Sequence, residues 1–220
     1  MSPHTPYIFS IINLTKRHGE FKCATAIKHA LVKAKMDTKT VIGVAGMPGA
    51  GKSLVTKIAE KMGYAVVTMG DVVREETRKR GLPLTPENMG AVMLKLREEE
   101  GPAAVAKRCI PRIENAKNDI VVVDGLRSLH ELEEYQRHFK KSVLIAIHAS
   151  PEIRFQRLFR RKRSDDPQGW ATFHERDIRE LSVGLSNLIV TADYLIVNEG
   201  VKAQTEEKIR GVLRKVAENE

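Results

Sequence analysis

The sequence is poor in cysteine and in long apolar runs, and each shortage excludes a class of protein. Only Cys23 and Cys109 occur in 220 residues, far apart and without metal-ligand spacing, so neither a disulfide framework nor a cysteine-ligated metal is expected. No segment approaches the roughly 20 apolar residues of a membrane-spanning helix. The apolar segment 7–14 is short and has no basic region before it, so a signal peptide is not expected. The sequence therefore predicts a cytoplasmic protein without membrane contact.

Acidic residues are in the minority. There are 37 lysines and arginines against 28 aspartates and glutamates, a net charge of +9, which favours anionic ligands without distinguishing nucleotides from nucleic acids. The basic residues lack the interleaved aromatic side chains that stack on bases, so a nucleic-acid partner is the least favoured.

Five short segments rich in valine and isoleucine alternate with helical patterns beyond residue 38. Apolar strands of this kind are buried on both faces, which is typical of a parallel sheet wrapped by helices. With right-handed crossovers, the sequence predicts a three-layer α/β/α sandwich around a five-stranded parallel sheet. The expected strands are 40–45, 64–69, 119–124, 142–148 and 193–197. The expected helices are 52–62, 71–80, 87–99, 102–116, 128–139, 151–163, 172–190 and 202–218.

The first 38 residues differ in character from residues 39–220. They carry an apolar patch and a helical pattern over 20–36, and they are interpreted as an N-terminal extension to one domain. Met36 stands just before the first strand, so whether residues 1–35 are an appendage or precede the true start stays open.

The segment GMPGAGKS has the spacing of a phosphate-binding P-loop and lies between an expected strand and an expected helix. Glycines let backbone N–H groups turn inward around an anion, and the helix N-terminus adds its positive end. Lys52 is predicted to reach the β- and γ-phosphates of ATP, and the Ser53 hydroxyl to ligate Mg²⁺. The predicted nucleotide-binding residues of the loop are Gly46, Met47, Pro48, Gly49, Ala50, Gly51, Lys52 and Ser53.

Asp124 ends the third expected strand. A carboxylate at this place in P-loop proteins commonly holds Mg²⁺, so Asp124 is predicted to join Ser53 in the metal site. The alternative is a turn former or helix cap.

Two further segments resemble the acceptor side of adenylate kinases and other nucleoside monophosphate kinases. MGDVVREETRKRG (69–81) resembles their Gly-Asp-x-hydrophobic-Arg element, which implies that Arg74 grips an acceptor phosphate and that Asp71 orients the attacking hydroxyl. DGLRS (124–128) is similar to their Asp-Gly-Phe-Pro-Arg stretch, one residue shorter and without the proline, which implies a second contact from Arg127. The alternative for 69–81 is a solvated helix capped by Asp71.

RFQRLFRRKRSDDP (154–167) resembles the arginine-rich lid of adenylate and dephospho-CoA kinases. Arg157 and Arg161 are four residues apart and share one helix face, and Arg163 resembles a second lid arginine. The resemblance implies that these three arginines stabilise the transferring charge and exclude water. A solvated basic run is the alternative.

LSVGLSNLIVTADYLIVNEG (181–200) resembles the end of dephospho-CoA kinases, which implies that Asn198 lies near the adenine of ATP; a simple turn is equally compatible with it. The chain is most similar to archaeal dephospho-CoA-kinase-related P-loop proteins of unsettled substrate, on the strength of RSDDP, Trp170 and ERDIREL (175–181). The element after the second strand departs from dephospho-CoA kinases proper. Glu175, Arg176, Asp177 and Glu180 are interpreted as a salt-bridged helix face.

The residues thus lead to a kinase that transfers the γ-phosphoryl group of ATP, with Mg²⁺, to a nucleotide-like small molecule. A second hypothesis is a slow ATPase that acts as a switch on a protein partner, which would give the N-terminal extension a role. A kinase of nucleic-acid ends ranks last.

Overall fold

A computed structural model describes residues 39–162 and 166–218 of the chain. The chain divides into two units after Thr38, and all the described residues belong to the second, Lys39–Glu220. The predicted extension 1–38, with its expected helix and Cys23, and the predicted lid residue Arg163 lie outside the described residues.

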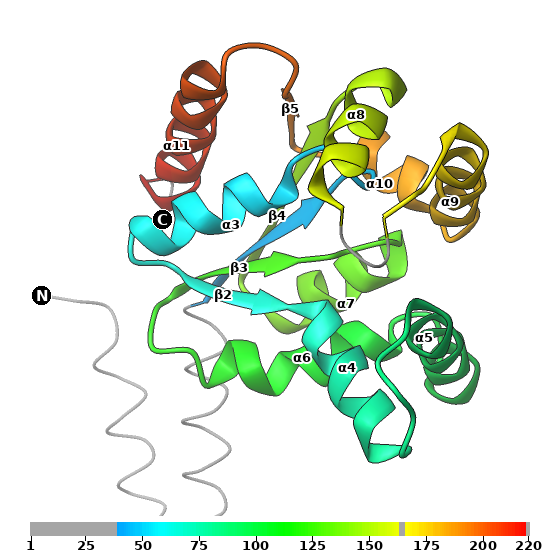
Figure 1. The fold of residues 1–220 in the computed structure, drawn as a ribbon. Coiled ribbons are helices and arrows are strands. Elements are labelled where there is room, and N and C mark those ends of the chain that lie inside the picture. The colour runs from blue at the N-terminus through cyan, green and yellow to red at the C-terminus, as the bar shows by residue number, and fades with distance from the viewer. Residues whose placement is uncertain (1–38, 163–165, 219–220) are drawn as a thin grey trace, which may run out of the picture. The chain divides into compact units, whose positions relative to one another are not determined.

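The described unit is built on a five-stranded, all-parallel sheet, as the sequence predicts (Figure 1). The strand order is β2-β3-β1-β4-β5, so the strand that leads into the P-loop is central. All six residues of β1 are buried, which explains its continuous apolar sequence. The strands are β1 (Thr40–Ala45), β2 (Ala65–Thr68), β3 (Ile120–Asp124), β4 (Lys141–His148) and β5 (Tyr194–Val197).

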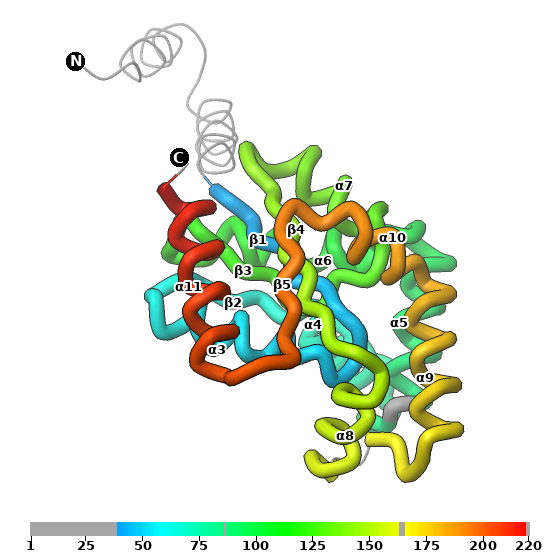
Figure 2. The backbone as a smooth tube through the Cα atoms, turned by 90° about the horizontal axis from the view of Figure 1, so that it is seen from above, coloured from blue at the N-terminus to red at the C-terminus, as the bar shows by residue number. Residues whose placement is uncertain are grey.

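Helices cover both faces of the sheet. Figure 1 shows α3 and α11 on one face and α4, α6 and α7 on the other, while α5 and α9 lie on the side toward which the strands run. Figure 2, seen from above, draws α5 and α9 on that same side. The helices are α3 (Lys52–Lys61), α4 (Met69–Lys79), α5 (Pro86–Glu100), α6 (Ala104–Glu114), α7 (Leu129–His138), α8 (Pro151–Arg161), α9 (Trp170–Ser182), α10 (Leu185–Val190) and α11 (Lys202–Glu218).

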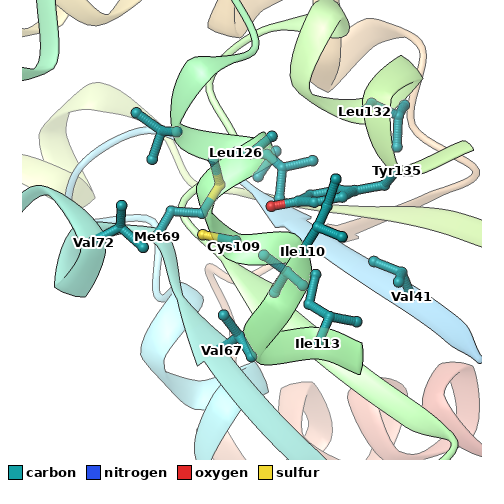
Figure 3. Packing of buried hydrophobic residues seen from close by; sticks show 14 of the residues in the cluster. Val41, Val67, Met69, Val72, Cys109, Ile110, Ile113, Leu126, Leu132 and Tyr135 are labelled. Carbon is teal, nitrogen blue, oxygen red and sulfur yellow. The ribbon is translucent and has the colours of Figure 1, made fainter. Parts of the chain in front are cut away.

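Each face of the sheet has its own apolar core. Alternate strand residues point to opposite faces, so Val41 packs with α6 and α7 residues while its neighbour Ile42 packs with α3 and α11 residues. Figure 3 shows the first core, in which Cys109 and Tyr135 lie among aliphatic side chains. This burial raises the pKa of the Cys109 thiol to about 11.

The predicted helix 172–190 is wrong in one respect, because the structure divides it into α9 and α10. Gly184 separates them with a φ of 100°, a left-handed conformation that glycine adopts without steric cost and that ends a helix. Helix α5 begins at Pro86, one residue before the expected start, and the Thr85 hydroxyl caps it by accepting a hydrogen bond from the Asn88 N–H at 3.2 Å. No helix in the described part of the chain is both long and apolar enough to cross a membrane.

Candidate phosphoryl-transfer site

The P-loop joins the end of β1 to the start of α3, at the carboxyl edge of the sheet. Gly46, Gly49 and Gly51 all have positive φ values, of 152°, 82° and 108°. The loop is also tightly enclosed: a methyl group on Gly46 would lie closer than 3.0 Å to the Ile147 carbonyl oxygen, and one on Gly51 would collide with the Asn198 amide. Backbone conformation and close packing therefore both require glycine in this loop.

Lys52 folds back over the loop. Its Nζ donates to the carbonyl oxygens of Gly46 at 2.6 Å and of Met47 at 3.4 Å. Burial lowers the pKa of Lys52, while the negative charges of Asp124 and Glu180 act in the opposite direction. The ammonium group is thus held among dipoles and carboxylates from which it can turn to phosphate oxygens.

Asp124 lies at the end of β3, where it pairs with Val44 of β1, two residues before the P-loop begins. Its Oδ1 is buried and has no hydrogen-bond partner among the described residues, and burial raises the pKa of its carboxyl group. A buried carboxylate oxygen and a hydroxyl are hard-oxygen donors of the kind that Mg²⁺ prefers, with phosphates and water completing the shell, and Ser53 supplies a hydroxyl in the first turn of α3. The residues present therefore fit Mg²⁺.

Helix α8 brings an arginine to the loop that the sequence left unassigned. Arg154 is buried and its Nη1 donates to the Pro48 carbonyl oxygen at 3.2 Å. The same guanidinium binds the carboxylate of Asp177 on α9 through Nη1 at 2.8 Å and Nη2 at 2.5 Å, and it lies over the Phe173 ring. The arginine therefore ties both helices to the P-loop.

The predicted lid arginines occupy different positions. Arg157 lies against the loop, with Nη2 donating to the Asn198 carbonyl oxygen at 2.8 Å and Nη1 within 3.5 Å of the Gly49 and Ala50 carbonyl oxygens. Arg161 turns instead to Asp166, at 3.0 and 2.5 Å. Arg157 therefore contacts the P-loop directly.

Asn198 lies beside the donor loop. Its side chain is buried and donates from Nδ2 to the Ala50 carbonyl oxygen at 2.8 Å. Its backbone N–H donates to His148 of β4 at 2.8 Å. The side chain therefore supports the loop backbone, and its approach to adenine stays a prediction.

Asp71 and Arg74, which the sequence predicts to bind the acceptor, pair with each other. The Arg74 guanidinium donates to Asp71 Oδ1 at 2.5 and 3.1 Å, and both side chains are well exposed. Among the described residues no hydrogen bond or ion pair connects this pair to the P-loop. The acceptor role predicted for the two residues is not tested by these contacts.

Arg127, by contrast, belongs to the charge cluster around Lys52. Its backbone N–H donates to Glu131 Oε2 at 2.7 Å, and its Nη1 lies 3.3 Å from Glu180 Oε2. Glu131 is fully buried and also accepts from Arg97 on α5 at 2.7 Å. Glu131, which Arg97 holds in place, consequently fixes the backbone of the loop that carries Arg127.

The predicted salt-bridged face of α9 is confirmed for Asp177 and Glu180, which pair with Arg154 and Arg127, although both side chains are largely buried. Asp177 is buried on Arg154, and the Glu180 side chain is only 13% exposed beside Arg127. Arg176 contributes a further positive charge near Lys52 and lies 4.0 Å from Asp166. The three-residue spacing of Asp177 and Glu180 was the available signal for a shared helix face, although it does not say which way that face turns.

Comparison with known protein families and curated proteins finds relatives of this chain. A model described as AAA domain matches residues 45–174. The UPF0200 protein of Methanothermobacter thermautotrophicus is 45% identical over 178 residues, which cover 81% of this chain and 91% of that protein. The UPF0200 protein of Thermococcus onnurineus is 46% identical over 180 residues, covering 80% and 97%.

Solved structures agree on the fold. A shikimate kinase from Bacteroides thetaiotaomicron aligns with a TM-score of 0.55 at 16% identity, covering 81% of this chain and 98% of that one. A shikimate kinase from Acinetobacter baumannii, solved with shikimate, has a TM-score of 0.51 at 17% identity, covering 86% and 98%. The chain thus has an α/β P-loop fold that it shares with kinases, and its relation to dephospho-CoA kinases stays a prediction.

Proposed function

The chain belongs to the UPF0200 family, and we propose that it is a kinase that transfers the γ-phosphoryl group of ATP to a nucleotide-like small molecule. The observation that carries the proposal is the charge cluster at the carboxyl edge of the sheet. There Lys52 lies close enough to Asp124, Arg127, Arg176 and Glu180 for their charges to influence its pKa. Ligands of open α/β sheets bind at this edge.

The donor half of the reaction belongs to the P-loop and α8. In this proposal the loop N–H groups and Lys52 bind the β- and γ-phosphates, and Arg157 moves from the loop carbonyls to the transferring group. Ser53 and Asp124 hold Mg²⁺, which when bound neutralises charge on the phosphate oxygens. Arg161 and Arg163 exclude water as the lid closes.

The acceptor half belongs to the segments after β2 and β3. Arg74 and Arg127 bind the anionic group of the acceptor, and Asp71 orients the hydroxyl that attacks. The acceptor oxygen bonds to the γ-phosphorus as the bond from phosphorus to the β–γ bridging oxygen breaks, so that ADP leaves with the bridging oxygen. An attacking hydroxyl loses its proton to solvent in this step, whereas an ionised phosphate oxygen of a nucleoside monophosphate has no proton to lose. The resemblance to nucleoside monophosphate and dephospho-CoA kinases supports an acceptor that carries a phosphate of its own.

The proposal is tested by measuring ADP formation with a panel of nucleoside monophosphates and dephospho-CoA, each with Mg²⁺ and ATP. We expect one acceptor to raise ADP formation well above the rate without acceptor, and Lys52→Ala to abolish the increase. Lys57→Ala, an exposed lysine on the same helix, is the matched control and should retain it. If no acceptor stimulates turnover, the kinase proposal fails.

A slow ATPase that switches a protein partner is the alternative. The observation that favours it is a row of exposed apolar side chains on α9, formed by Trp170, Ile178 and Leu181. ATP binding without any acceptor stimulation, together with a partner that is recovered only in the presence of ATP, would support the switch instead.

A further inference from the structure

Helix α9 carries two acidic residues whose ion pairs differ in length and in exposure to solvent. Asp177 holds Arg154 at 2.8 and 2.5 Å, and the side chains are 12% and 4% exposed. Charge-assisted hydrogen bonds have lengths of about 2.7–2.9 Å. Glu180 lies 3.3 Å from Arg127, whose side chain is 38% exposed. The first pair is tight and structural, whereas the second is loose and open to solvent on the arginine side.

The loose pair has rigid supports on both sides. The Arg127 backbone is fixed by Glu131, and its Nη1 also lies 3.7 Å from the sulfur of Met93 on α5. Glu180 is fixed because Asp177, one turn earlier on the same helix, is bound to Arg154. Only the side-chain tips are therefore free to change partner.

A carboxylate at this position is costly for an enzyme that binds phosphates. Like charges that face each other across a binding site disfavour binding when neither is neutralised. Glu180 lies near Lys52, which the P-loop presents to ATP, and also beside Arg127 on the acceptor side. An incoming anion must consequently compete with Glu180 for the Arg127 guanidinium.

We propose that Glu180 is a specificity-determining residue of the acceptor site, a built-in counter-ion that the anionic group of the acceptor displaces from Arg127. This inference rests on the proposed function for the identity of the site. A phosphate dianion presents more charge and more acceptor oxygens to a guanidinium than a carboxylate does. Glu180 thus selects acceptors with a phosphate group over those with a single carboxylate.

The inference is tested by titrating inorganic phosphate into the full chain, with Trp170 fluorescence and calorimetry as readouts. Trp170 is the single tryptophan of the sequence and lies at the start of α9. We expect Glu180→Gln to bind phosphate about tenfold more tightly than the wild type, because the competing charge is gone. The gain should vanish in the double variant Glu180→Gln/Arg127→Met, and it should be smaller in Glu180→Asp.

Glu175→Gln makes the same chemical change on an exposed position of α9 and should leave phosphate affinity unchanged. A residue with a purely structural role would lose affinity on substitution. Equal or weaker binding by Glu180→Gln, or a gain that persists without Arg127, therefore overturns the inference. The titrations are run with and without Mg²⁺ and a non-hydrolysable ATP analogue. If the analogue fails to bind, the kinase proposal fails, while the comparison of the Glu180 and Arg127 variants still decides the role of Glu180.

Discussion

Arg154 of α8 and Asp177 of α9 form a buried, two-pronged ion pair that also contacts the P-loop. The guanidinium donates to both carboxylate oxygens and, through Nη1, to the carbonyl oxygen of Pro48. It lies 4.9 Å from the centre of the Phe173 ring. One side chain thus joins the P-loop to α8 and α9.

Removing the carboxylate should destabilise the protein strongly. We expect Asp177→Ala to lower the free energy of unfolding by about 3–5 kcal/mol, because Arg154 would remain buried without its partner. Glu206→Ala, which breaks the exposed Lys202–Glu206 pair, is the matched control and should cost less than about 1 kcal/mol. Urea unfolding followed by circular dichroism measures both. Equal losses would show that the Arg154–Asp177 pair contributes no more than a surface pair.

The P-loop glycines can be tested against two glycines in open surroundings. Gly90→Ala, in helix α5 with nothing within 4 Å of the added methyl group, should stabilise the protein by about 0.5–1 kcal/mol. Gly63→Ala has the same free space but a φ of 83°, and should cost about 1–2 kcal/mol. Gly46→Ala should cost more than Gly63→Ala, because it adds a collision with the Ile147 carbonyl. Urea unfolding should give this order, and a Gly46 variant as stable as the Gly63 variant would contradict the packing argument.

We expect the Asp124 carboxylate to lower the free energy of unfolding while it contributes to Mg²⁺-dependent ATP binding. Burial raises the pKa of its carboxyl group, so the folded protein holds this proton more tightly than the unfolded chain does. The stability that the neutral carboxyl group contributes at low pH is therefore lost as pH rises through the raised pKa. We expect Asp124→Asn to raise the unfolding midpoint at pH 7 and to weaken Mg²⁺-dependent ATP binding at least tenfold. Asp119→Asn, on the exposed residue before the same strand, should change neither. Normal Mg·ATP binding by Asp124→Asn would show that Asp124 is not a metal ligand.

Alkaline pH should destabilise the core around Cys109. The thiol pKa rises from 9.0 to about 11 on folding, so the unfolded chain loses this proton first, and stability falls between those two pH values. The thiol accounts for up to about 3 kcal/mol of that fall, at 1.36 kcal/mol for each pKa unit. Cys109→Ala should show a correspondingly shallower decline in free energy of unfolding from pH 9 to pH 11. Parallel curves for the two proteins would show that the buried thiol does not titrate in this range.

The sequence predicted the sheet closely because its strands are apolar on both faces and short. The predicted strand 40–45 matches the observed β1, and the other four agree within one residue at each end. The P-loop was predictable for a similar reason, since its glycines are needed wherever the backbone must wrap around an anion. A local sequence pattern is enough to predict an element when the residues that determine its conformation all lie within one segment.

The role of α9 could not be predicted in this way. Asp177 and Glu180 are acidic residues in a polar helix, and their burial depends on partners 23 and 53 residues earlier in the chain, Arg154 and Arg127. The division at Gly184 was missed because a glycine within a helical pattern is also tolerated inside helices. Tertiary contacts therefore decide the burial of Asp177 and Glu180.

The hydrogen bond from Asn198 to the Ala50 carbonyl has a consequence for biosynthesis. It links residues 148 positions apart in the chain, so a ribosome that adds 5–20 residues per second needs about 7–30 s between the two. During that interval the glycine-rich loop has left or is leaving the ribosome while the side chain that supports it has not been made. The P-loop therefore cannot complete this hydrogen bond until Asn198 has been synthesised.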